Sequence, residues 1–600
     1  MNKKVPFFSK IIFFLSAFLA VFFLVNPTLI FYQQQLGFIA DGYIWRQYLS
    51  YPGGLADYLS VFLFQFTISR FWGTAMFIVL MFGIVQLLGK ILNRGEDEHL
   101  MLLPILPLIL LAVLIADYHY LVFLPFLMVL ILLLLWILKK LVSDHKNTLI
   151  NIAAIITLSV AGYYLMGGFG LFVFELSAIL LVIFSNKNRK ILKVSVLILI
   201  GVLLPFIAAK YIFFITINDA FWRLQPYQAE YHLKVIDYVF FSSVPFLLLA
   251  NRLLPSKVAM LLNRTWLLPL QYVVLILAFI LLMATKVDRE VKFKLQIDQL
   301  AFNDQWEKIL QKVDGVLYSD RIVAFDVNRA LYHTGKMTTD LFKYNQSWGI
   351  DGLLVSKVMN DKVLLPTTEL YIDFGYINEA IHWGNEAVSF RDKSPQVMEQ
   401  LIKAHIIEHK YDAAQLYINI MKKMPFFRKK ALYYQDMILT NFIPNELKQK
   451  RDLMPYNDFI ARTFPTAGEL MGLLQDRPQN KMVYEYLMSY FLLKNDVNDF
   501  VKYYSMGKRF NYGKLPRIYQ EAIALYIYNQ QGSGKPAPNV KLDQEVIDDF
   551  KDYLSTIKNL DGKMDIAQPV LKDKFGATYW YYVHYDSPVT KKMEITEEKN

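Results

Sequence analysis

The chain contains no cysteine in 600 residues. Disulfide bonds, thiolate metal ligands and cysteine nucleophiles are therefore excluded, and the absence suits an oxidising compartment without proving one. Signatures of soluble enzymes are lacking as well: there is no Walker A sequence, no dinucleotide fingerprint, no HExxH and no GxSxG with suitable flanks. No class of soluble enzyme is indicated by motif.

Long apolar runs are absent after Thr285, although they recur throughout the first half of the chain. A helix needs about 20 predominantly apolar residues to cross the hydrocarbon core of a bilayer. Hydrophobic residues make up 55% of the chain, which is high for an ordinary soluble protein. The distribution predicts a multi-pass membrane domain followed by a water-soluble one.

The second half also lacks any strong charge imbalance. It holds 43 Lys and Arg residues against 41 Asp and Glu, whereas the part up to Thr285 holds 20 against 11. The basic excess therefore belongs to the membrane part, where the positions of Lys and Arg set orientation. A basic groove for nucleic acid is not indicated.

Nine apolar stretches have the length of membrane spans. They are residues 11–31, 71–88, 100–116, 121–138, 149–166, 169–184, 194–214, 237–250 and 267–284. The first could pass for a signal peptide, but its apolar run is too long and lacks a small-residue cleavage site, so we expect a retained helix. The eighth is short and contains Pro245, which leaves the count open by one.

Loop charges predict the orientation of these spans. With a cytoplasmic N-terminus, the inside segments hold 15 Lys and Arg residues and the outside segments hold five. An odd number of spans then puts everything after the last one outside, in the periplasm of a bacterium. We predict an all-α, multi-pass inner-membrane protein with domains at residues 1–286, 287–530 and 531–600.

Residues 287–530 are expected to form a soluble helical-repeat domain. The segments LYIDFGYINEAIHWGNEAV and HIIEHKYDAAQLYINIM align so that Tyr376 matches Tyr411 and Ala380 matches Ala414. The offset is close to the roughly 34-residue period of tetratricopeptide helix pairs. The match is loose, and an irregular α-solenoid or a helical bundle explains it about as well.

The end of the chain changes composition after Gln530. GSGKPAP is typical of a linker, and the polar tail KKMEITEEKN is expected to be disordered. Between them, the aromatic-rich stretch at residues 577–585 is expected to form a terminal packing element.

The loop between the first two spans, Gln33–Ser69, carries two acids, Asp41 and Asp57. After a turn at Pro52-Gly53-Gly54, apolar residues recur at helical spacing with polar residues opposite them, which predicts an amphipathic helix at the membrane surface. The apolar residues are Leu55, Leu59, Phe62, Leu63 and Phe66, and the polar ones are Asp57 and Ser60. The alternative is that this helix merely extends the second span outward.

The ionisable side chains of the membrane part gather on the predicted outer side. Beyond the loop-one acids they are Asp117, His119, Glu175, Lys210, Arg223, Glu230 and His232. A carboxylate within the hydrocarbon costs a few kcal/mol and usually faces a polar cavity or a partner, so Glu175 is the sharpest pointer to a site. An ion pair with Arg70 or Lys210 would explain Glu175 equally well. Isolated histidines give no metal triad by spacing.

This layout resembles the GT-C class of membrane glycosyltransferases, which have an acidic first outer loop, surface helices in that loop and often a C-terminal domain outside. That resemblance implies Asp41 as general base or metal ligand, with Asp117 and Glu175 as further catalytic candidates. Asp41 stands alone where the class commonly has paired acids, nine spans are fewer than usual, and Asp41-Gly42 could simply begin a turn. The chain also resembles a bacterial multi-pass family of unknown function carrying a PGGLADYL-type stretch, here Pro52–Leu59.

Two functions follow as hypotheses. The first is transfer of a sugar from a polyprenyl-phosphate carrier at the outer face, with Asp41 as the base and no cofactor beyond a divalent metal. Candidates for binding the substrate and its phosphate are Arg46, Arg70, His119, Arg223 and His232. The second is a non-enzymatic, membrane-anchored scaffold that binds envelope proteins or polymers through its helical repeats. A transporter is less supported, because no inverted repeat is visible.

Overall fold

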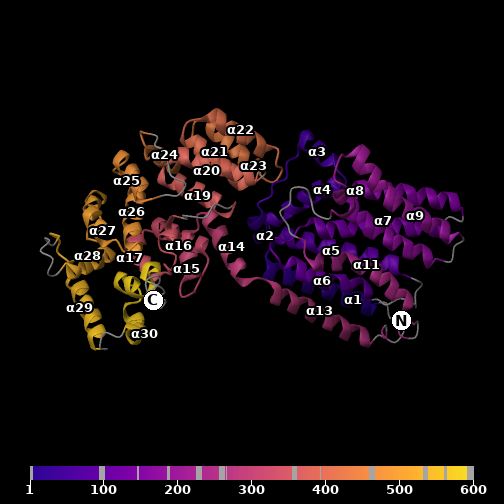
Figure 1. Ribbon diagram of the computed structural model, residues 1–600, viewed down its shortest axis with the longest axis horizontal. Helices are drawn as coiled ribbons and strands as arrows, with labels where there is room; N and C mark the ends of the chain where they lie inside the picture. Colours follow the sequence, from indigo (N-terminus) through magenta and orange to yellow (C-terminus); the bar gives the residue numbers. More distant parts are fainter. Residues whose placement is uncertain are drawn as a thin grey trace. The chain divides into compact units, whose positions relative to one another are not determined.

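The computed structural model describes residues 4–93, 102–144, 147–185, 189–223, 233–255, 258, 262, 264, 266–354, 361–391, 394–457, 466–530, 538–559 and 564–590. Within these ranges every regular element is a helix, so the all-α prediction is confirmed (Figure 1). The chain forms two compact units. The first contains Met1–Lys292 and Lys423–Phe426, and the second contains Phe293–Lys422 and Phe427–Asn600.

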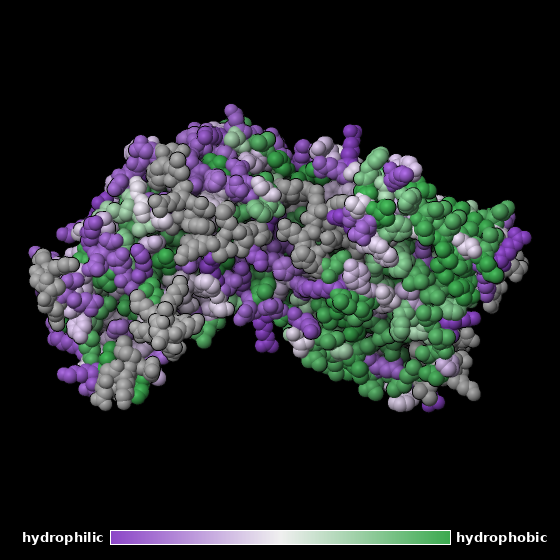
Figure 2. Space-filling view, viewed as in Figure 1, coloured by the Kyte–Doolittle hydropathy of each residue, from purple (hydrophilic) through white to green (hydrophobic). Residues whose placement is uncertain are grey.

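Seven described helices of the first unit are long and apolar enough to cross a membrane, and all seven coincide with predicted spans. They are α1 (Lys4–Ala20) with η1 (Val21–Val25), α5 (Arg70–Leu92), α7 (Phe123–Asp144), α8 (Thr148–Ile183), α9 (Lys190–Ile207) with η4 (Ala208–Ile212), α11 (Val235–Leu253) and α13 (Leu267–Lys286). Much of their visible surface is hydrophobic (Figure 2). These features identify a membrane protein. Shorter helices are α2 (Pro27–Gln34), η3 (Leu103–Ile105), α6 (Leu106–Ile115) and α10 (Ile217–Trp222).

Helix α8 is broken in its middle at Gly167, whose φ of 77° and ψ of −173° are not helical. A straight helix of 36 residues would measure about 54 Å, well beyond the roughly 30 Å of a bilayer core. Val182, near the end of α8, lines the same cavity as Leu138 of α7 and Leu92 of α5. Gly167 instead contacts Pro52 of the first loop. Helix α8 therefore runs out and back as two arms that correspond to the predicted spans 149–166 and 169–184.

The cavity at this end of the bundle has a volume of about 290 Å³ and lies where α5, α7, α8 and α11 end. The last carbonyl groups of a helix have no partner within it and need one elsewhere. Lys139 Nζ donates to the carbonyls of Lys90, Ile91 and Asn93 at 3.0, 2.8 and 2.9 Å. Asn251 Nδ2 donates to the Leu92 carbonyl at 2.8 Å. Side chains of α7 and α11 thus cap α5.

The first loop contains two helices, α3 (Gly42–Leu49) and α4 (Gly54–Phe64), followed by the 3₁₀ turn η2 (Gln65–Ile68). Helix α4 buries Asp57 and Ser60 together with Val61 and Phe64, whereas Leu59 is exposed and Phe62 is partly exposed. Ser69 has an extended backbone between η2 and α5. The predicted loop-one helix is therefore present, and it is not a continuation of the second span.

The second unit begins within α14 (Arg289–Phe302) and continues to η7 (Tyr582–Asp586). The elements between them are α15 (Trp306–Val313), α16 (Arg321–His333), α17 (Met337–Asp340), η5 (Leu341–Lys343), α18 (Ile350–Leu354), α19 (Asp361–Phe374), α20 (Ile377–Phe390), α21 (Pro395–Ile407), α22 (Tyr411–Lys422), α23 (Arg428–Leu439), α24 (Asn445–Asp452), α25 (Ala467–Asp476), α26 (Lys481–Leu493), α27 (Val497–Tyr503), η6 (Tyr504–Phe510), α28 (Arg517–Asn529), α29 (Gln544–Asn559), α30 (Met564–Phe575) and α31 (Tyr579–Tyr581). Consecutive helices pack against each other through much of this series, from α19 to α23 and from α25 to α31 by way of α28.

Small residues let these helices approach closely. Ala380 of α20 and Ala414 of α22, which the sequence aligns, are both fully buried. A Cβ atom on Gly384 would lie 2.6 Å from Leu401 Cδ2 of α21, so a larger residue there would require the Leu401 side chain to move. The aligned alanines are thus both in the core, one on α20 and one on α22.

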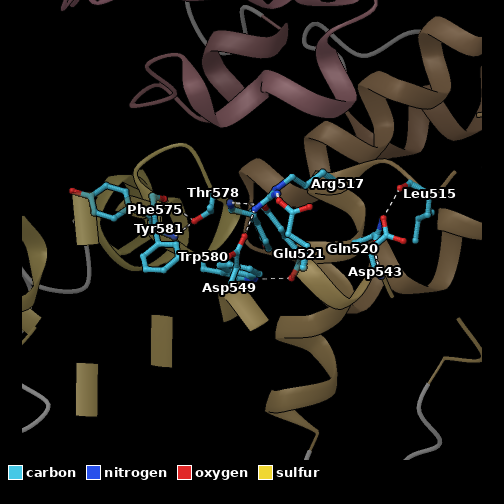
Figure 3. A network of polar contacts seen from close by, with 12 residues as sticks. Leu515, Arg517, Gln520, Glu521, Asp543, Asp549, Phe575, Thr578, Trp580 and Tyr581 are labelled. Carbon is cyan, nitrogen blue, oxygen red and sulfur yellow. Dashed lines mark hydrogen bonds and ion pairs between the residues drawn. The ribbon is translucent and has the colours of Figure 1, made fainter. Parts of the chain in front are cut away.

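The aromatic stretch near the C-terminus is held by a polar network on α28 (Figure 3). Glu521 Oε2 accepts a hydrogen bond from the Tyr579 backbone N–H at 2.9 Å, and Trp580 Nε1 donates to the Glu521 carbonyl at 2.8 Å. Arg517 Nε donates to Glu521 Oε1 at 3.1 Å. Burial raises the pKa of Glu521 to about 7, although Arg517 opposes this. The predicted linker GSGKPAP falls almost entirely, and the polar tail entirely, outside the described residues.

Candidate functional site

Three segments of the first unit meet at the end of the bundle that carries the first loop, and glycines make their close approach possible. Gly53 donates its backbone N–H to the Tyr164 carbonyl at 2.9 Å. A Cβ atom on Gly53 would lie 3.2 Å from the Gly167 nitrogen, and one on Gly168 would lie 2.1 Å from the Ala220 carbonyl oxygen. The first loop, the turn of α8 and helix α10 therefore touch backbone to backbone.

Asp57 lies beside this junction in the first turn of α4 and is only 3% exposed. Its Oδ2 accepts a hydrogen bond from the Tyr51 hydroxyl at 2.6 Å. Burial and the charge of Asp57 raise the pKa of Tyr51, so the hydroxyl stays protonated and donating. The hydrogen bond between Tyr51 and Asp57 holds the Pro52–Gly54 turn against helix α4. The sequence marks Asp57 only as one of two loop acids and gives no sign of this partner.

Asp41 is the N-cap of α3. Its Oδ1 accepts from the Tyr43 backbone N–H at 2.7 Å, and its Oδ2 accepts from Lys423 Nζ at 2.6 Å. Lys423 lies in the short segment that belongs to the first unit. The hydrogen bond from Lys423 lowers the pKa of Asp41, which favours the carboxylate and makes it a weaker base. The sequence suggests a turn at Asp41-Gly42. In the structure these two residues begin helix α3.

Asp117 and His119 lie together after α6, as their sequence spacing suggests. Asp117 Oδ1 accepts from the His119 backbone N–H at 2.9 Å and from His119 Nδ1 at 3.3 Å. Its Oδ2 accepts from Lys234 Nζ. Burial alone would raise the pKa of Asp117, but the bonds from His119 and Lys234 outweigh it and hold the pKa below its usual range.

Hydrogen bonds at both ring nitrogens orient the His119 side chain. Its Nε2 lies 2.8 Å from Gln33 Nε2, and because an amide nitrogen only donates, Nε2 is the acceptor and Nδ1 carries the proton toward Asp117. The side chain is 52% exposed. The imidazole of this carboxylate–imidazole pair is therefore exposed to solvent and held by hydrogen bonds.

Glu175 lies on the second arm of α8 and is 6% exposed. It packs against α9, where a Cβ atom on Gly201 would come within 1.9 Å of its Oε2. Its Oε1 has no hydrogen-bond partner among the described residues. Arg70 does not reach it, because its Nε donates to the Phe22 carbonyl at 2.7 Å and its guanidinium lies over the Phe22 ring. The alternative of an ion pair with Arg70 is therefore wrong, and Lys210 forms no ion pair with Glu175 in the described part of the chain.

Two of the remaining basic candidates, Arg46 and Arg223, lie in the described part of the chain. Arg46 is exposed on α3. Arg223 pairs with Asp219 at 3.3 Å, and its charge acts on Tyr51. His232 and Glu230 lie outside the described residues.

Among the described residues, Asp41, Asp117 and Glu175 do not share a contacting residue, since each is held by different elements. Within the described ranges, no group of three or more His, Asp or Glu side chains is arranged to hold a metal ion. The described residues at this end of the bundle therefore include an accessible acid–histidine pair beside several acids that serve local structure.

The second unit contains a larger charge cluster that the sequence does not reveal. Arg329 is 3% exposed and pairs with Glu369 at 2.7 Å and Asp373 at 3.0 Å. Asp373 also contacts His333 and Lys450 at 3.2 and 3.4 Å. Burial would raise the pKa of Asp373, but Lys450 and Arg329 lower it well below its usual value.

The cluster joins α16, α19 and α24, with the Trp306 ring of α15 lying 5.0 Å from the guanidinium. Asp326 is a further carboxylate, 3.9 Å from Arg329. The residues of the cluster are far apart in the chain, so no local sequence motif predicts it. The arrangement is a buried ion network that ties successive helices of the second unit together.

Fold and site together define a polytopic helical membrane protein with a large helical second unit. The chain belongs to the family of unknown function DUF6057, whose profile matches residues 3–586. The predicted membership of a family of unknown function is thus confirmed. No curated protein and no solved structure is significantly similar to the chain.

Proposed function

We propose that this protein is a membrane-anchored helical scaffold that holds a partner protein outside the cytoplasmic membrane. The membrane unit crosses the bilayer nine times, with its N-terminus in the cytoplasm. The second unit is a tetratricopeptide-like array in the periplasm. The number of crossings, the orientation and the repeat character of the second unit are each supported separately.

The count of nine adds two crossings to the seven long helices. One comes from the second arm of α8, since the chain reverses at Gly167. The other is α6, a short apolar helix. Leu92, the last residue of α5, and Leu138, in the C-terminal part of α7, line one cavity, so the chain between them has to return to the opposite end before α7 begins. Lysine and arginine asymmetry in the loops supports the orientation.

The observation that carries the scaffold proposal is the series of helix pairs. Asp361 and Pro395, the first residues of α19 and α21, are about 34 residues apart, the period of tetratricopeptide repeats. Stacked pairs of this kind form extended binding surfaces. Large apolar side chains remain exposed on α22, on α23 and just after it, where a partner would cover them: Leu416, Tyr433, Leu439 and Phe442.

A lipid-linked-sugar transferase is the second candidate. It is favoured by the Asp117–His119 pair, because a carboxylate that orients an exposed imidazole is a common general base. Asp41 supports it less than its position in the first loop suggests, since Lys423 and the α3 backbone already occupy its carboxylate.

Complementation of a gene deletion separates the two candidates. One variant carries Asp41→Asn, Asp117→Asn and His119→Gln, and the other carries Leu439→Ser and Phe442→Ser. Both are expressed at wild-type level in the deletion strain, and survival under envelope stress is scored together with the glycan profile of the envelope.

A scaffold requires full rescue by the first variant and loss of rescue by the second, with an unchanged glycan profile in both. Loss of rescue and an altered glycan profile with the first variant alone would replace the scaffold by the transferase.

A further inference from the structure

The turn between α22 and α23 has the composition of a membrane-surface contact. Residues 422–430 read KKMPFFRKK, and no acidic residue occurs between Asp412 and Asp436. We propose that this turn binds the headgroups of anionic phospholipids at the outer face of the membrane. The proposal does not depend on whether the protein is a scaffold or a transferase.

The tip of the turn belongs to the membrane unit. Lys423–Phe426 clusters with that unit, and the Ala40 backbone N–H donates to the Lys423 carbonyl at 2.8 Å. The Phe426 ring lies 6.1 Å from the Phe62 ring and 5.6 Å from the Phe66 ring. Phe62 lies on α4 and Phe66 on η2, and both side chains are partly exposed.

The side of α4 that bears Phe62 is apolar, while its polar residues Asp57 and Ser60 are buried against the protein. A helix that turns its apolar side outward at the end of a membrane bundle is oriented toward lipid rather than water. The proposal places Phe426 where acyl chains give way to headgroups.

Only some of the basic residues of the turn are neutralised by acidic side chains of the protein. Two of the five are used, because Lys423 pairs with Asp41 and Lys430 pairs with Glu399, both at 2.6 Å. Lys422, Arg428 and Lys429 make no ion pair with any residue in the described part of the chain. Arg428 and Lys429 are exposed. Three cations beside an aromatic tip complement an anionic surface.

The absence of cysteine provides a clean probe. Pro425→Cys in the full chain is labelled with an environment-sensitive fluorophore, and the protein is reconstituted into vesicles of phosphatidylcholine alone or with phosphatidylglycerol. Leu317→Cys, an exposed position on the second unit, serves as the labelled control.

The expected result is a blue shift of the Pro425→Cys label in phosphatidylglycerol vesicles. High salt and the triple variant Lys422→Gln, Arg428→Gln, Lys429→Gln abolish it, whereas Lys422→Arg with Lys429→Arg retains it. Inorganic phosphate with phosphatidylcholine vesicles produces no shift, and the Leu317→Cys label does not respond. A shift that is equal in both vesicles, or indifferent to salt and charge, overturns headgroup binding.

Discussion

Replacing Arg329 by Met is expected to destabilise the second unit by about 3–5 kcal/mol, which is the usual cost of removing one partner from a buried ion pair. The substitution leaves Glu369 and Asp373 without the cation that lies 2.7 and 3.0 Å from them. Both carboxylates are on α19, so their repulsion acts directly on the packing of α16 against it. Thermal unfolding of the full chain in detergent, followed by circular dichroism, measures the effect as a fall of roughly 10 °C.

The matched control is Lys541→Met, which removes an exposed cation from the same unit. It should change the unfolding temperature little, since surface charges contribute about 0–1 kcal/mol. Arg329→Lys should fall between the two, because an ammonium group cannot reproduce the two-pronged contact. Equal unfolding temperatures for Arg329→Met and Lys541→Met would show that the cluster contributes nothing to stability.

Substituting the glycines at the turn of α8 should have the largest effect in the membrane unit. Gly168→Ala sets a Cβ atom 2.1 Å from the Ala220 carbonyl oxygen, and a backbone atom cannot move aside as a side chain can. Gly167→Ala forces an L-residue to φ 77° and ψ −173°, a region that is essentially restricted to glycine. We expect each to cost about 3 kcal/mol and to lower the yield of folded protein.

Gly42→Ala is the matched control for these variants, because no atom lies within 4 Å of the Cβ position at the start of α3. It should retain or slightly gain stability, as alanine favours a helix. Size-exclusion chromatography of detergent extracts after a heat step gives the remaining folded fraction. If Gly168→Ala survives the heat step as well as Gly42→Ala, the close contact with α10 does not exist in solution.

The apolar pattern of the sequence predicts most of the helices of the membrane unit. All seven long helices coincide with predicted spans, because the length of an apolar run is set by bilayer thickness, which is independent of tertiary contacts. The break of α8 can also be predicted from the sequence, since Gly167 and Gly168 interrupt the apolar sequence between two predicted spans. What the pattern cannot supply is a partner for each polar group.

The site residues illustrate this limit. Asp41 and Asp117 are visible as acids in a greasy context, but Lys423 and Lys234, which pair with them, lie more than a hundred residues away in sequence. The burial of Asp57 against Tyr51 depends on which side of α4 meets the protein, and an amphipathic pattern at a membrane surface does not decide that. The Arg329 cluster is invisible for the same reason, because its ion pairs form only when distant helices pack.

The sidedness of the chain is tested most directly by thiol labelling in a background that has no native cysteine. Single cysteines replace Phe214 after η4, Leu317 of the second unit and Arg252 at the inner end of α11, all of which are exposed. With an impermeant maleimide on spheroplasts, Phe214→Cys and Leu317→Cys should react at once, and Arg252→Cys only after lysis. Protection of Leu317→Cys together with labelling of Arg252→Cys would contradict an odd number of crossings from a cytoplasmic N-terminus.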